Sequence, residues 1–544
     1  MKQRITYIVP NPDDYNPETI EVTSNSFTLQ NVKAVKEHRI TFGLSELPTE
    51  VYNIKSHSFS RVPSRHQSIL LTTTQLRKAL EQWHELHIRW ATDQPYKTIP
   101  PFTSRISPGL HVFFTPQKSQ QSDDPLCTLL TTIFGPIPKC TTPSESFTKL
   151  PTLSERFTHS ASSQFYALVP SLTHLVQHLQ SQLCAPTSPA CKIGAQSLLT
   201  ASSLDIDYDA ISHALVVNAF WSEAPGKEGW SETVLQSKKK ETVEIGVLNR
   251  ERNTDPEDLQ FAGFLVVLGV DGKPKPTLFQ APARHYPLPL SSSSPSLQTY
   301  TTTFRHPTGL HPTLLLTLSP STLSPPDATC KLHAHLTLPS HLFIDKYQFS
   351  DPLFLSSHHL ASLRSLSGAT DLEAPDWTVA QWGSAALFEI AVPEDADEEP
   401  RGKVTAGFNV SIPLHLRYMP AANSSHTRVP LPWPVIFWAC RAEDGTKMNV
   451  NPFDRVHLGY EGLFGPRTRF MHVSPKVEEG RELVEYVDVP VLDLRKAAWV
   501  EWGTVGTVVL AFLGLCWVLF RPLGRREEEE AKSGKNEKDG KKKQ

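Results

Sequence analysis

The sequence predicts a mainly β protein, with an α+β N-terminal half, that ends in a single transmembrane helix. Three observations predict this class. The 544 residues include 46 prolines, which interrupt helices and suit edge strands, turns and loops. Short apolar or alternating runs recur through the second half of the chain, as in antiparallel β-sandwiches. Residues 502–520 form a long uncharged stretch near the C-terminal end.

Residues 1–286 are expected to form an N-terminal α+β domain. The runs "SFTLQNV", "LHVFFTP", "ISHALVVNAFW" and "FAGFLVVLGVDGKP" have the patterns of strands. Two stretches have helical spacing instead, namely "TTTQLRKALEQWHEL", with apolar positions from Leu76 to Leu86, and residues 161–184. Pro170 is expected to begin or kink the second helix. A mixed pattern of this kind does not fix the order of the strands.

A Ser/Pro-rich segment at 287–298, "PLPLSSSSPSLQ", is expected to be a linker. Residues 299–498 then carry the strand-like runs "HPTLLLTL", "CKLHAHLTLPSHLFID", "GFNVSIPLHLRYM" and "PWPVIFWAC" at short intervals. These runs predict a second domain that resembles a β-sandwich.

Residues 499–520 are predicted to cross a membrane, because about 20 apolar residues span the ~30 Å hydrocarbon layer. Trp499, Trp502 and Trp517 lie near the ends of this segment, where indole rings are favoured. Arginines and a lysine-rich tail follow the segment, whereas few cations closely precede it. The positive-inside rule therefore predicts a cytosolic tail at 521–544 and a lumenal bulk.

The composition of the tail predicts disorder. Its last residues are "KKKQ", and Lys541 and Lys542 stand where a dilysine signal for retrieval to the endoplasmic reticulum would stand. The predicted location is therefore the endoplasmic reticulum membrane, with a single pass. The start, "MKQRITYIVPNPDDYNPETI", lacks the apolar core of a signal peptide, so no cleaved signal peptide is expected.

Two further features agree with a lumenal bulk. Asn409 and Asn423 begin glycosylation sequons, which are used only on that side. Six cysteines lie outside the span, and an even number is compatible with disulfides in an oxidising compartment. The plausible bridges join Cys127 to Cys140, Cys184 to Cys191, and Cys330 to Cys440.

The charge and the motifs argue against several functional classes. The net charge is −3 and the pI about 6.7, whereas a nucleic-acid surface needs a basic field. The sequence contains neither a Gly-x-Ser-x-Gly elbow for a serine nucleophile nor a glycine-rich phosphate loop. No nucleic-acid partner and no cofactor are therefore predicted.

Two clusters could hold a metal ion. Asp205, Asp207 and Asp209 in "LDIDYD" could gather a divalent cation, although a solvated acidic strand is the favoured interpretation. In "HAHLTLPSH", the first two histidines, His333 and His335, would share one face of a strand, and His341 follows them. Such a set could ligate zinc, but a polar strand face is again favoured.

The stretch "LHLRYMP" is a candidate contact for a partner protein. His415, Arg417 and Tyr418 are expected to lie on a strand, and Arg and Tyr are favoured at interfaces. The competing interpretation is a sandwich strand with one solvated face.

Several stretches resemble the PIG-X family. They are "HPTLLLTL", "CKLHAHLTLPSHLFIDKYQ", "LHLRYMPA" and "PLPWPVIFWAC" in the second half. Near the start, "LHIRWATDQPY" and "PPFTSRISPGLHVFFTP", and later "GLFGPRTRF", are similar to the fungal group of this family, the protease-B-nonderepressible proteins. The resemblance covers roughly residues 1–520.

This resemblance implies a non-catalytic role in the endoplasmic reticulum. Family members stabilise the catalytic subunit of glycosylphosphatidylinositol (GPI) mannosyltransferase I, a multispanning enzyme called PIG-M. That enzyme transfers the first, α-1,4-linked mannose from dolichol-phosphate-mannose to the GPI precursor. Two other interpretations stay open: a general lumenal chaperone for secretory and vacuolar proteins, and a lumenal glycosyltransferase that uses Asp205 and Asp207.

Overall fold

The fold is described by a computed structural model. It covers residues 1–10, 19–46, 73–117, 124–151, 163–184, 189–226, 228–236, 241–251, 258–271, 273–288, 298–393, 407–443, 445 and 451–540, with 521–540 described by backbone alone. The chain divides into two compact units. The first comprises Met1–Tyr418 and Val429–Val487, and the second comprises Met419–Arg428 and Asp488–Gln544.

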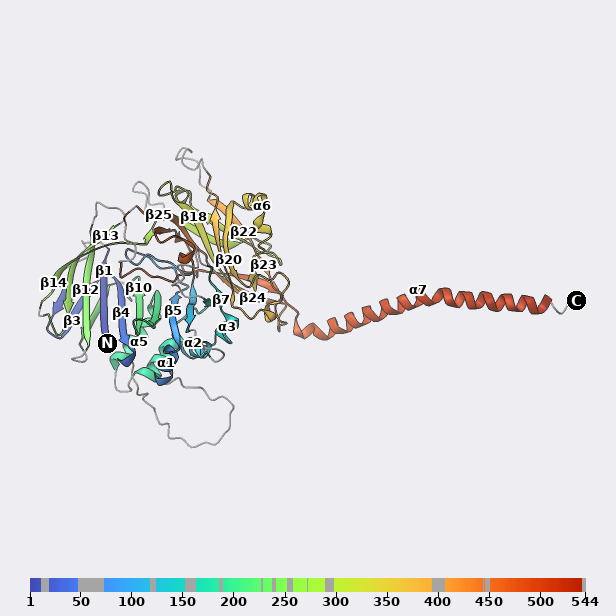
Figure 1. The fold of residues 1–544 in the computed structure, drawn as a ribbon, viewed down its shortest axis with the longest axis horizontal. Coiled ribbons are helices and arrows are strands. Elements are labelled where there is room, and N and C mark those ends of the chain that lie inside the picture. Colours follow the sequence, from blue (N-terminus) through green and yellow to red (C-terminus); the bar gives the residue numbers. More distant parts are fainter. Residues whose placement is uncertain are drawn as a thin grey trace, which may run out of the picture. The chain divides into compact units, whose positions relative to one another are not determined.

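The largest sheet of the first unit has eleven strands (Figure 1). Their order is β14 (Lys275–Pro282), β13 (Asp258–Val267), β12 (Thr242–Glu251), β1 (Lys2–Val9), β4 (Val35–Gly43), β10 (Ala214–Trp221), β9 (Ser203–Asp209), β5 (Trp83–Ala91), β6 (Gly109–Pro116), β8 (Ser163–Ala167) and β7 (Thr148–Lys149). Strand β1 pairs in parallel with β12 and antiparallel with β4.

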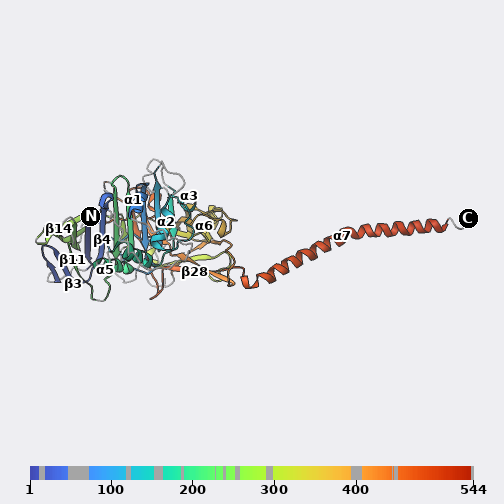
Figure 2. The ribbon, with the colours of Figure 1, turned by 90° about the horizontal axis from the view of Figure 1, so that it is seen from below.

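A small second layer packs on this sheet. It consists of β11 (Trp230–Leu235), β3 (Ser26–Val32) and β2 (Ile20–Val22), drawn beside the large sheet in Figure 2. Phe27 of β3 and Tyr7 of β1 are buried in the same apolar cluster, and their rings stack with centroids 6.5 Å apart. Burial of such aromatic rings is a large source of stability.

Helices α1 (Thr73–Leu80), α2 (Leu126–Phe134), α3 (Pro143–Ser146), α4 (Thr173–His178) and α5 (Pro189–Ser197) belong to the same half. Leu126, Leu130 and Phe134 of α2 and Leu175 of α4 are buried in the cluster that includes Trp90 and Val112 of the sheet. These helices therefore cover part of the sheet with their apolar faces.

The second half of the sequence forms further sheets. A six-stranded sheet has the order β15 (His285–Pro287), β26 (Thr468–His472), β25 (Val435–Arg441), β18 (Lys331–Pro339), β21 (Gly383–Ile390) and β20 (Leu360–Gly368). A four-stranded sheet has the order β22 (Phe408–Pro413), β17 (Thr313–Leu318), β16 (Thr299–Phe304) and β27 (Ser474–Pro475). Two pairs, β19 (Leu342–Phe343) with β23 (His415–Leu416) and β24 (His426–Pro432) with β28 (Val484–Pro490), and the helix α6 (Pro352–Ser357) complete it.

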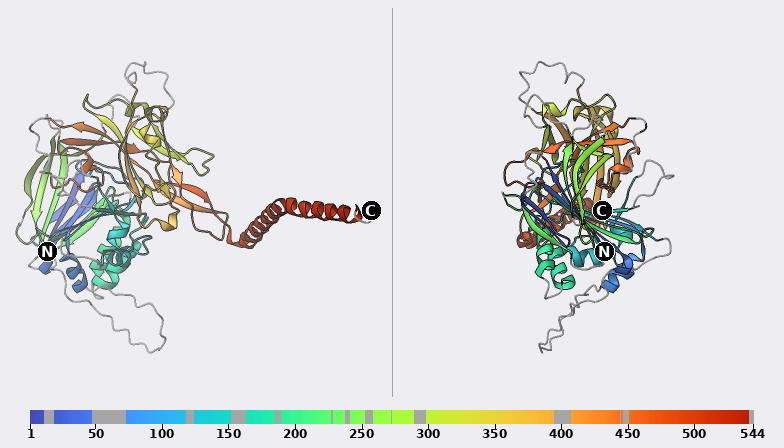
Figure 3. Two further views of the ribbon diagram at one scale, coloured as in Figure 1. Left: turned by 45° about the vertical axis from the view of Figure 1, so that its right-hand side comes forward. Right: turned by 90° about the vertical axis from the view of Figure 1, so that its left-hand side faces the viewer.

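Figure 3 shows the yellow and orange strands of this second half gathered beside the blue and green ones. The two halves share apolar cores. Trp382 and Ala385 are buried in the main cluster of the N-terminal half, and Ala91 and Ile106 lie with Phe437 and other residues of the second half. Residues on both sides of the expected linker thus belong to one compact unit. Most of that linker, 289–297, lies outside the described residues.

The second unit contains helix α7 (Ala497–Gly540). The Asp493 carboxylate accepts a hydrogen bond from the backbone N–H of Arg495 and caps the turn that precedes the helix. The segment Leu494–Phe520 is long and apolar enough to cross a membrane, with a mean hydropathy of 2.1 over its most apolar stretch. The helical backbone continues to Gly540, through the segment for which the composition predicts disorder. Its Glu and Lys residues are favourable helix formers.

The mainly β class with one C-terminal apolar helix is confirmed. Two helix predictions are wrong in part. Helix α1 ends at Leu80, and Trp83 begins strand β5, because β5 is buried on both faces and shows no alternation. Within 161–184, Ser163–Ala167 is a strand that pairs with β6, and helix α4 starts only after Pro170.

Candidate functional site

Arg417 is buried, although the sequence suggested it as a partner contact. Strand β23 pairs with β19, and Arg417 follows it directly. Its side chain is 2% exposed, and Nη1 donates to the carbonyl oxygen of Ala374 at 2.8 Å while Nη2 donates to that of Ala369 at 3.2 Å. The guanidinium also lies 4.4 Å from the ring centroid of Phe343. Arg417 therefore holds the 369–374 loop and is not accessible to a partner.

Tyr418, the next residue, is 70% exposed. Its carbonyl oxygen accepts a hydrogen bond from the backbone N–H of Asp376 at 2.9 Å. This bond places the neighbouring Trp377, which is 59% exposed, close to Tyr418. Tyr418 and Trp377 thus expose two large aromatic side chains at the stretch "LHLRYMP", which the sequence suggested as a partner contact.

Three more exposed apolar side chains surround β23. Leu310 contributes the carbonyl oxygen that accepts from Leu416 N–H, and Leu372 lies in the loop held by Arg417. Tyr347, 64% exposed, precedes Gln348, whose amide oxygen is 3.3 Å from His415 Nε2. Leu310, Tyr347, Leu372, Trp377 and Tyr418 are called the aromatic surface below. Trp and Tyr are enriched at protein interfaces, where their large rings make rigid contacts.

Several charged side chains lie along the aromatic surface. Asp371 and Glu373 are exposed in the loop that carries Leu372, and Asp345 lies two residues before Tyr347. Lys346 is the exposed cation beside them, with Nζ 5.1 Å from the centroid of the Tyr347 ring. The rim formed by these four residues is acidic on balance.

His415 is half-buried beneath the aromatic surface. Its Nδ1 lies 2.9 Å from Nδ1 of His311, and its ring stacks on Phe343. Burial, together with the neighbouring His311, lowers the pKa of His415 below its ordinary value. His415 is thus neutral at physiological pH and is less accessible than Tyr418.

The aspartates of "LDIDYD" form ion pairs. Arg89 Nη2 donates to Asp207 Oδ1 at 2.6 Å, and Arg455 Nη2 donates to Asp205 Oδ1 at 2.7 Å. Burial alone would raise the pKa of Asp207, but Arg89 and His87 outweigh it and hold that pKa well below its usual range. The carboxylates are thus bound by the protein's own cations, which leaves little capacity for a divalent ion.

Asp209 has a local role. Its carboxylate accepts from the backbone N–H groups of Ile211 and Ser212 and closes the turn after β9. Such a turn is the usual use of an Asp at a strand end.

The three histidines of the second predicted metal set do not converge on one point among the described residues. His333 Nδ1 donates to the carbonyl oxygen of Lys331 at 2.8 Å, and His341 Nε2 donates to that of Pro430 at 3.1 Å. Burial lowers the pKa of His333, His335 and His341 to about 4. All three are neutral at physiological pH; His333 and His335 are buried, and His341 is half-buried.

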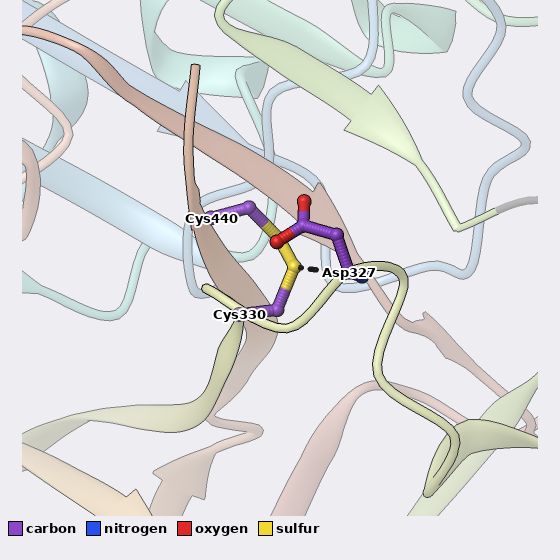
Figure 4. Close-up of side chains that lie close together, drawn as sticks. All are labelled: Asp327, Cys330 and Cys440. Atoms are coloured by element: carbon purple, nitrogen blue, oxygen red, sulfur yellow. Dashed lines mark hydrogen bonds between the residues drawn. A yellow bond between two sulfur atoms is a disulfide. The ribbon is translucent and has the colours of Figure 1, made fainter. Parts of the chain in front are cut away.

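Within the described residues, the geometry of a metal cluster is met by Asp327, Cys330 and Cys440 (Figure 4). The two sulfur atoms are bonded to each other, so neither is a thiolate that could bind a metal. Asp327 instead lies 3.4 Å from Arg469 Nη2 and accepts from the backbone N–H of Thr329.

The other predicted site residues are placed as follows. Disulfides join Cys127 to Cys140 and Cys184 to Cys191, in addition to Cys330–Cys440. Asn409 and Asn423 are exposed, the first on β22. Lys541 and Lys542 lie outside the described residues.

Comparison with known proteins decides the family. Residues 307–520 match the family model described as PIG-X / PBN1. The chain is 44% identical to "Protein pbn1" of Emericella nidulans over 99% of this chain and 100% of the relative. The chain belongs to the PIG-X/PBN1 family. Further PBN1 relatives include those of Aspergillus fumigatus, 43% identical over 96% of this chain and 94% of the relative, and Neurospora crassa, 39% identical over 96% of each.

The PIG-X/PBN1 match covers β17 to the apolar segment of α7, and so includes all five residues of the aromatic surface. Sequence reasoning found Tyr418 but missed Trp377, Tyr347 and Leu372. These residues lie 41 to 71 positions upstream. Pairing of β19 with β23 brings in the segment of Tyr347, and hydrogen bonds to Arg417 and Tyr418 bring in the segment of Leu372 and Trp377.

Proposed function

We propose that this chain is a non-catalytic subunit that stabilises the catalytic subunit of GPI mannosyltransferase I in the endoplasmic reticulum membrane. That enzyme adds the first α-1,4-linked mannose from dolichol-phosphate-mannose to the GPI-anchor precursor. The bulk of the chain would lie in the lumen, and the residues after the span in the cytosol.

The observation that carries this proposal is the aromatic surface in a member of the PIG-X/PBN1 family. Its five apolar side chains are exposed and lie in segments that hydrogen bonds join to residues 415–418, and exposed apolar patches mark sites of protein interaction. Tyr418 directly precedes Met419–Arg428, which belongs to the unit that carries the apolar helix. The proposed partner is membrane-embedded, because this chain itself carries a helix long and apolar enough to cross a membrane.

The polar clusters support an accessory role. Asp205 and Asp207 are bound to arginines, His333 and His335 are buried, and these two histidines and His341 are neutral at physiological pH. The groups that a lumenal glycosyltransferase would use are thus engaged in holding the fold.

The test is a double variant of the two most prominent aromatic residues, Trp377→Ala with Tyr418→Ala. A tag placed before the final "KKKQ" allows pull-down of the full chain from detergent-solubilised membranes. We expect co-purification of the multispanning mannosyltransferase subunit to fall at least tenfold, and its steady-state level to fall with it. The level of this chain itself should stay unchanged, because both side chains are exposed.

The matched control is Ile211→Ala with Leu278→Ala, which removes two exposed apolar side chains elsewhere. It should leave partner recovery unchanged. If the mannosyltransferase subunit is neither co-purified with the unaltered chain nor reduced when the chain is absent, the proposal is wrong. Recovery of several immature secretory proteins instead would favour a general chaperone.

A further inference from the structure

The residues that precede helix α7 are held to a loop that is distant in sequence. Ala422 N–H donates to the carbonyl oxygen of Leu492 at 3.1 Å, and Leu494 N–H donates to that of Ala422 at 2.9 Å. Val491 N–H donates to the carbonyl oxygen of Ser425 at 3.0 Å. These backbone hydrogen bonds tie the loop to the start of the apolar helix.

The segments joined in this way, 419–428 and 488–496, belong to the second compact unit and are called the juxtamembrane platform below. On it, Leu492 and Leu494 are 46% and 51% exposed. Asp493 between them is buried and has an extended backbone, with φ −73° and ψ 111°. Because alternate residues of an extended backbone share a face, the two leucines project together and Asp493 projects to the other side. The platform thus carries a small apolar face.

The apolar face lies close to the level at which a membrane would begin. Residues 502–520 carry no charge and extend about 28 Å as a helix, which matches the ~30 Å hydrocarbon layer. Leu494 stands eight positions before Trp502, roughly 12 Å further along the helix axis. The polar headgroups occupy ~5–8 Å of that distance. The platform is therefore within a few ångströms of the headgroups.

The charges around the apolar face are balanced. Arg495 Nε and Nη2 each donate to the Asp493 carboxylate at 3.0 Å, so this pair brings no net charge to a membrane surface. The cations and anions of the platform and the first turns of α7 are equal in number: Arg428, Arg495 and Lys496 against Asp488, Asp493 and Glu501. A contact between the platform and lipid is therefore apolar and does not require anionic lipid.

We propose that the juxtamembrane platform binds the lipid surface, with Leu492 and Leu494 inserted among the headgroups. Transfer of these half-exposed side chains from water into the interface is favourable. Trp499 and Trp502, which are 83% and 73% exposed, follow on the helix, and indole rings favour the same layer. The leucines and tryptophans together fix the depth of the helix. This inference rests on the membrane-embedded part of the proposed function and not on the mannosyltransferase partner.

Nitroxide labels in the full chain, reconstituted in phosphatidylcholine vesicles, test the contact. Cys516→Ser removes the one free thiol, and a single new cysteine then carries the label. The label at Leu494→Cys should collide with a water-soluble nickel complex at least fivefold less often than the label at Ile211→Cys, an exposed position outside the platform. Leu492→Cys should be shielded in the same way. Val509→Cys, in the middle of the apolar segment, reports whether the helix is embedded.

The outcomes separate this inference from the proposed function. Shielding at Val509 without shielding at Leu494 overturns the platform contact and leaves the membrane helix in place. Access of the nickel complex to both positions overturns the contact and the membrane-embedded part of the proposed function together. Shielding at Leu494 that appears only when phosphatidylserine is added overturns the apolar contact in favour of an electrostatic one.

A double variant tests the leucines themselves. With Leu492→Asn and Leu494→Asn, a label at Ala498→Cys should become at least threefold more accessible to the nickel complex, because the platform is no longer anchored. The platform should still fold, since its segments are joined through backbone atoms. The matched control, Ile211→Asn with Leu278→Asn, changes two exposed apolar residues elsewhere and should leave the label unaffected. Equal accessibility in the leucine variant and the control overturns the inference.

Discussion

The indole Nε1 of Trp382 donates a hydrogen bond to the carbonyl oxygen of Gln164 at 2.8 Å. The two residues are 218 positions apart and both are buried. One comes from the segment before β21 and the other from β8 of the eleven-stranded sheet. This bond joins the two halves of the first compact unit through one core.

Trp382→Phe should therefore destabilise both halves together. The substitution removes one of two donors to the Gln164 carbonyl oxygen, since Thr148 Oγ1 also donates to it at 3.3 Å, and the loss of one such hydrogen bond costs about 0.5–1.5 kcal/mol. Denaturant unfolding of the full chain in detergent should show one shifted transition. Two separate transitions, of which only one moves, would show that the halves unfold independently.

Asp207→Ala should lower the amount of folded protein. Arg89 is buried and loses the carboxylate bonded to its Nη2. Removal of one partner from a buried pair costs up to about 3–5 kcal/mol, and less here because Asp207 is partly exposed. Pulse-chase and denaturant unfolding measure the loss. A variant that stays abundant and stable but loses all function would favour a catalytic or metal-binding Asp207.

His335→Gln should reduce the acid sensitivity of the fold. Burial lowers the pKa of His335 to about 4, whereas an unfolded histidine has a pKa of about 6.5. Below pH 6.5 the unfolded state binds a proton that the folded state excludes, so the free energy of unfolding falls as the pH falls toward 4.

The expected change in that slope is about 1.4 kcal/mol per pH unit for one group. Denaturant unfolding between pH 6.5 and 4.5 measures it. His426→Gln, at an exposed position, serves as the control. An unchanged slope in His335→Gln would show that folding does not lower the pKa of His335.

Removal of the Cys330–Cys440 disulfide should lower the free energy of unfolding more than removal of either of the other two disulfides. It closes a loop of 110 positions, against 13 and 7 for the other two. The chain-entropy estimate for so long a loop is about 4–5 kcal/mol. Thermal unfolding of Cys330→Ala with Cys440→Ala, compared with the paired variants of the shorter loops, checks this ranking.

Asn409→Gln and Asn423→Gln should each remove one glycan if the bulk is lumenal. Both asparagines are exposed and can meet the transferase. Gel mobility before and after removal of N-glycans measures occupancy. A chain whose mobility never changes in this assay, together with cysteines that react as free thiols, would place the bulk in the cytosol.

The strands were predicted from the sequence more accurately than the helices and the side-chain contacts. Runs such as Ser26–Val32 were evident because their apolar residues alternate or cluster in the usual way. Trp83 and Leu86 satisfied a helical spacing by coincidence, since β5 is buried on both faces. No local pattern distinguishes such a strand from a buried helix.

The exposure of the candidate site residues could not be predicted from the sequence either. Arg417 and Tyr418 are neighbours in the sequence, yet the first is buried against three carbonyl oxygens and the second is exposed. The difference depends on the 369–374 loop, which is distant in sequence. Tertiary hydrogen bonds of this kind cannot be derived from composition or spacing.

The position of β1 has a consequence for how this protein is made. Its hydrogen-bonding partner β12 lies about 240 residues further along the chain, with Lys2 opposite Thr242. During synthesis, the backbone edge of β1 that pairs with β12 therefore stays unpaired until nearly half of the polypeptide has been made. Contacts so distant in sequence make folding slow and leave unpaired strand edges exposed in the meantime. A protein proposed to stabilise another chain thus has reason to depend on folding helpers during its own biogenesis.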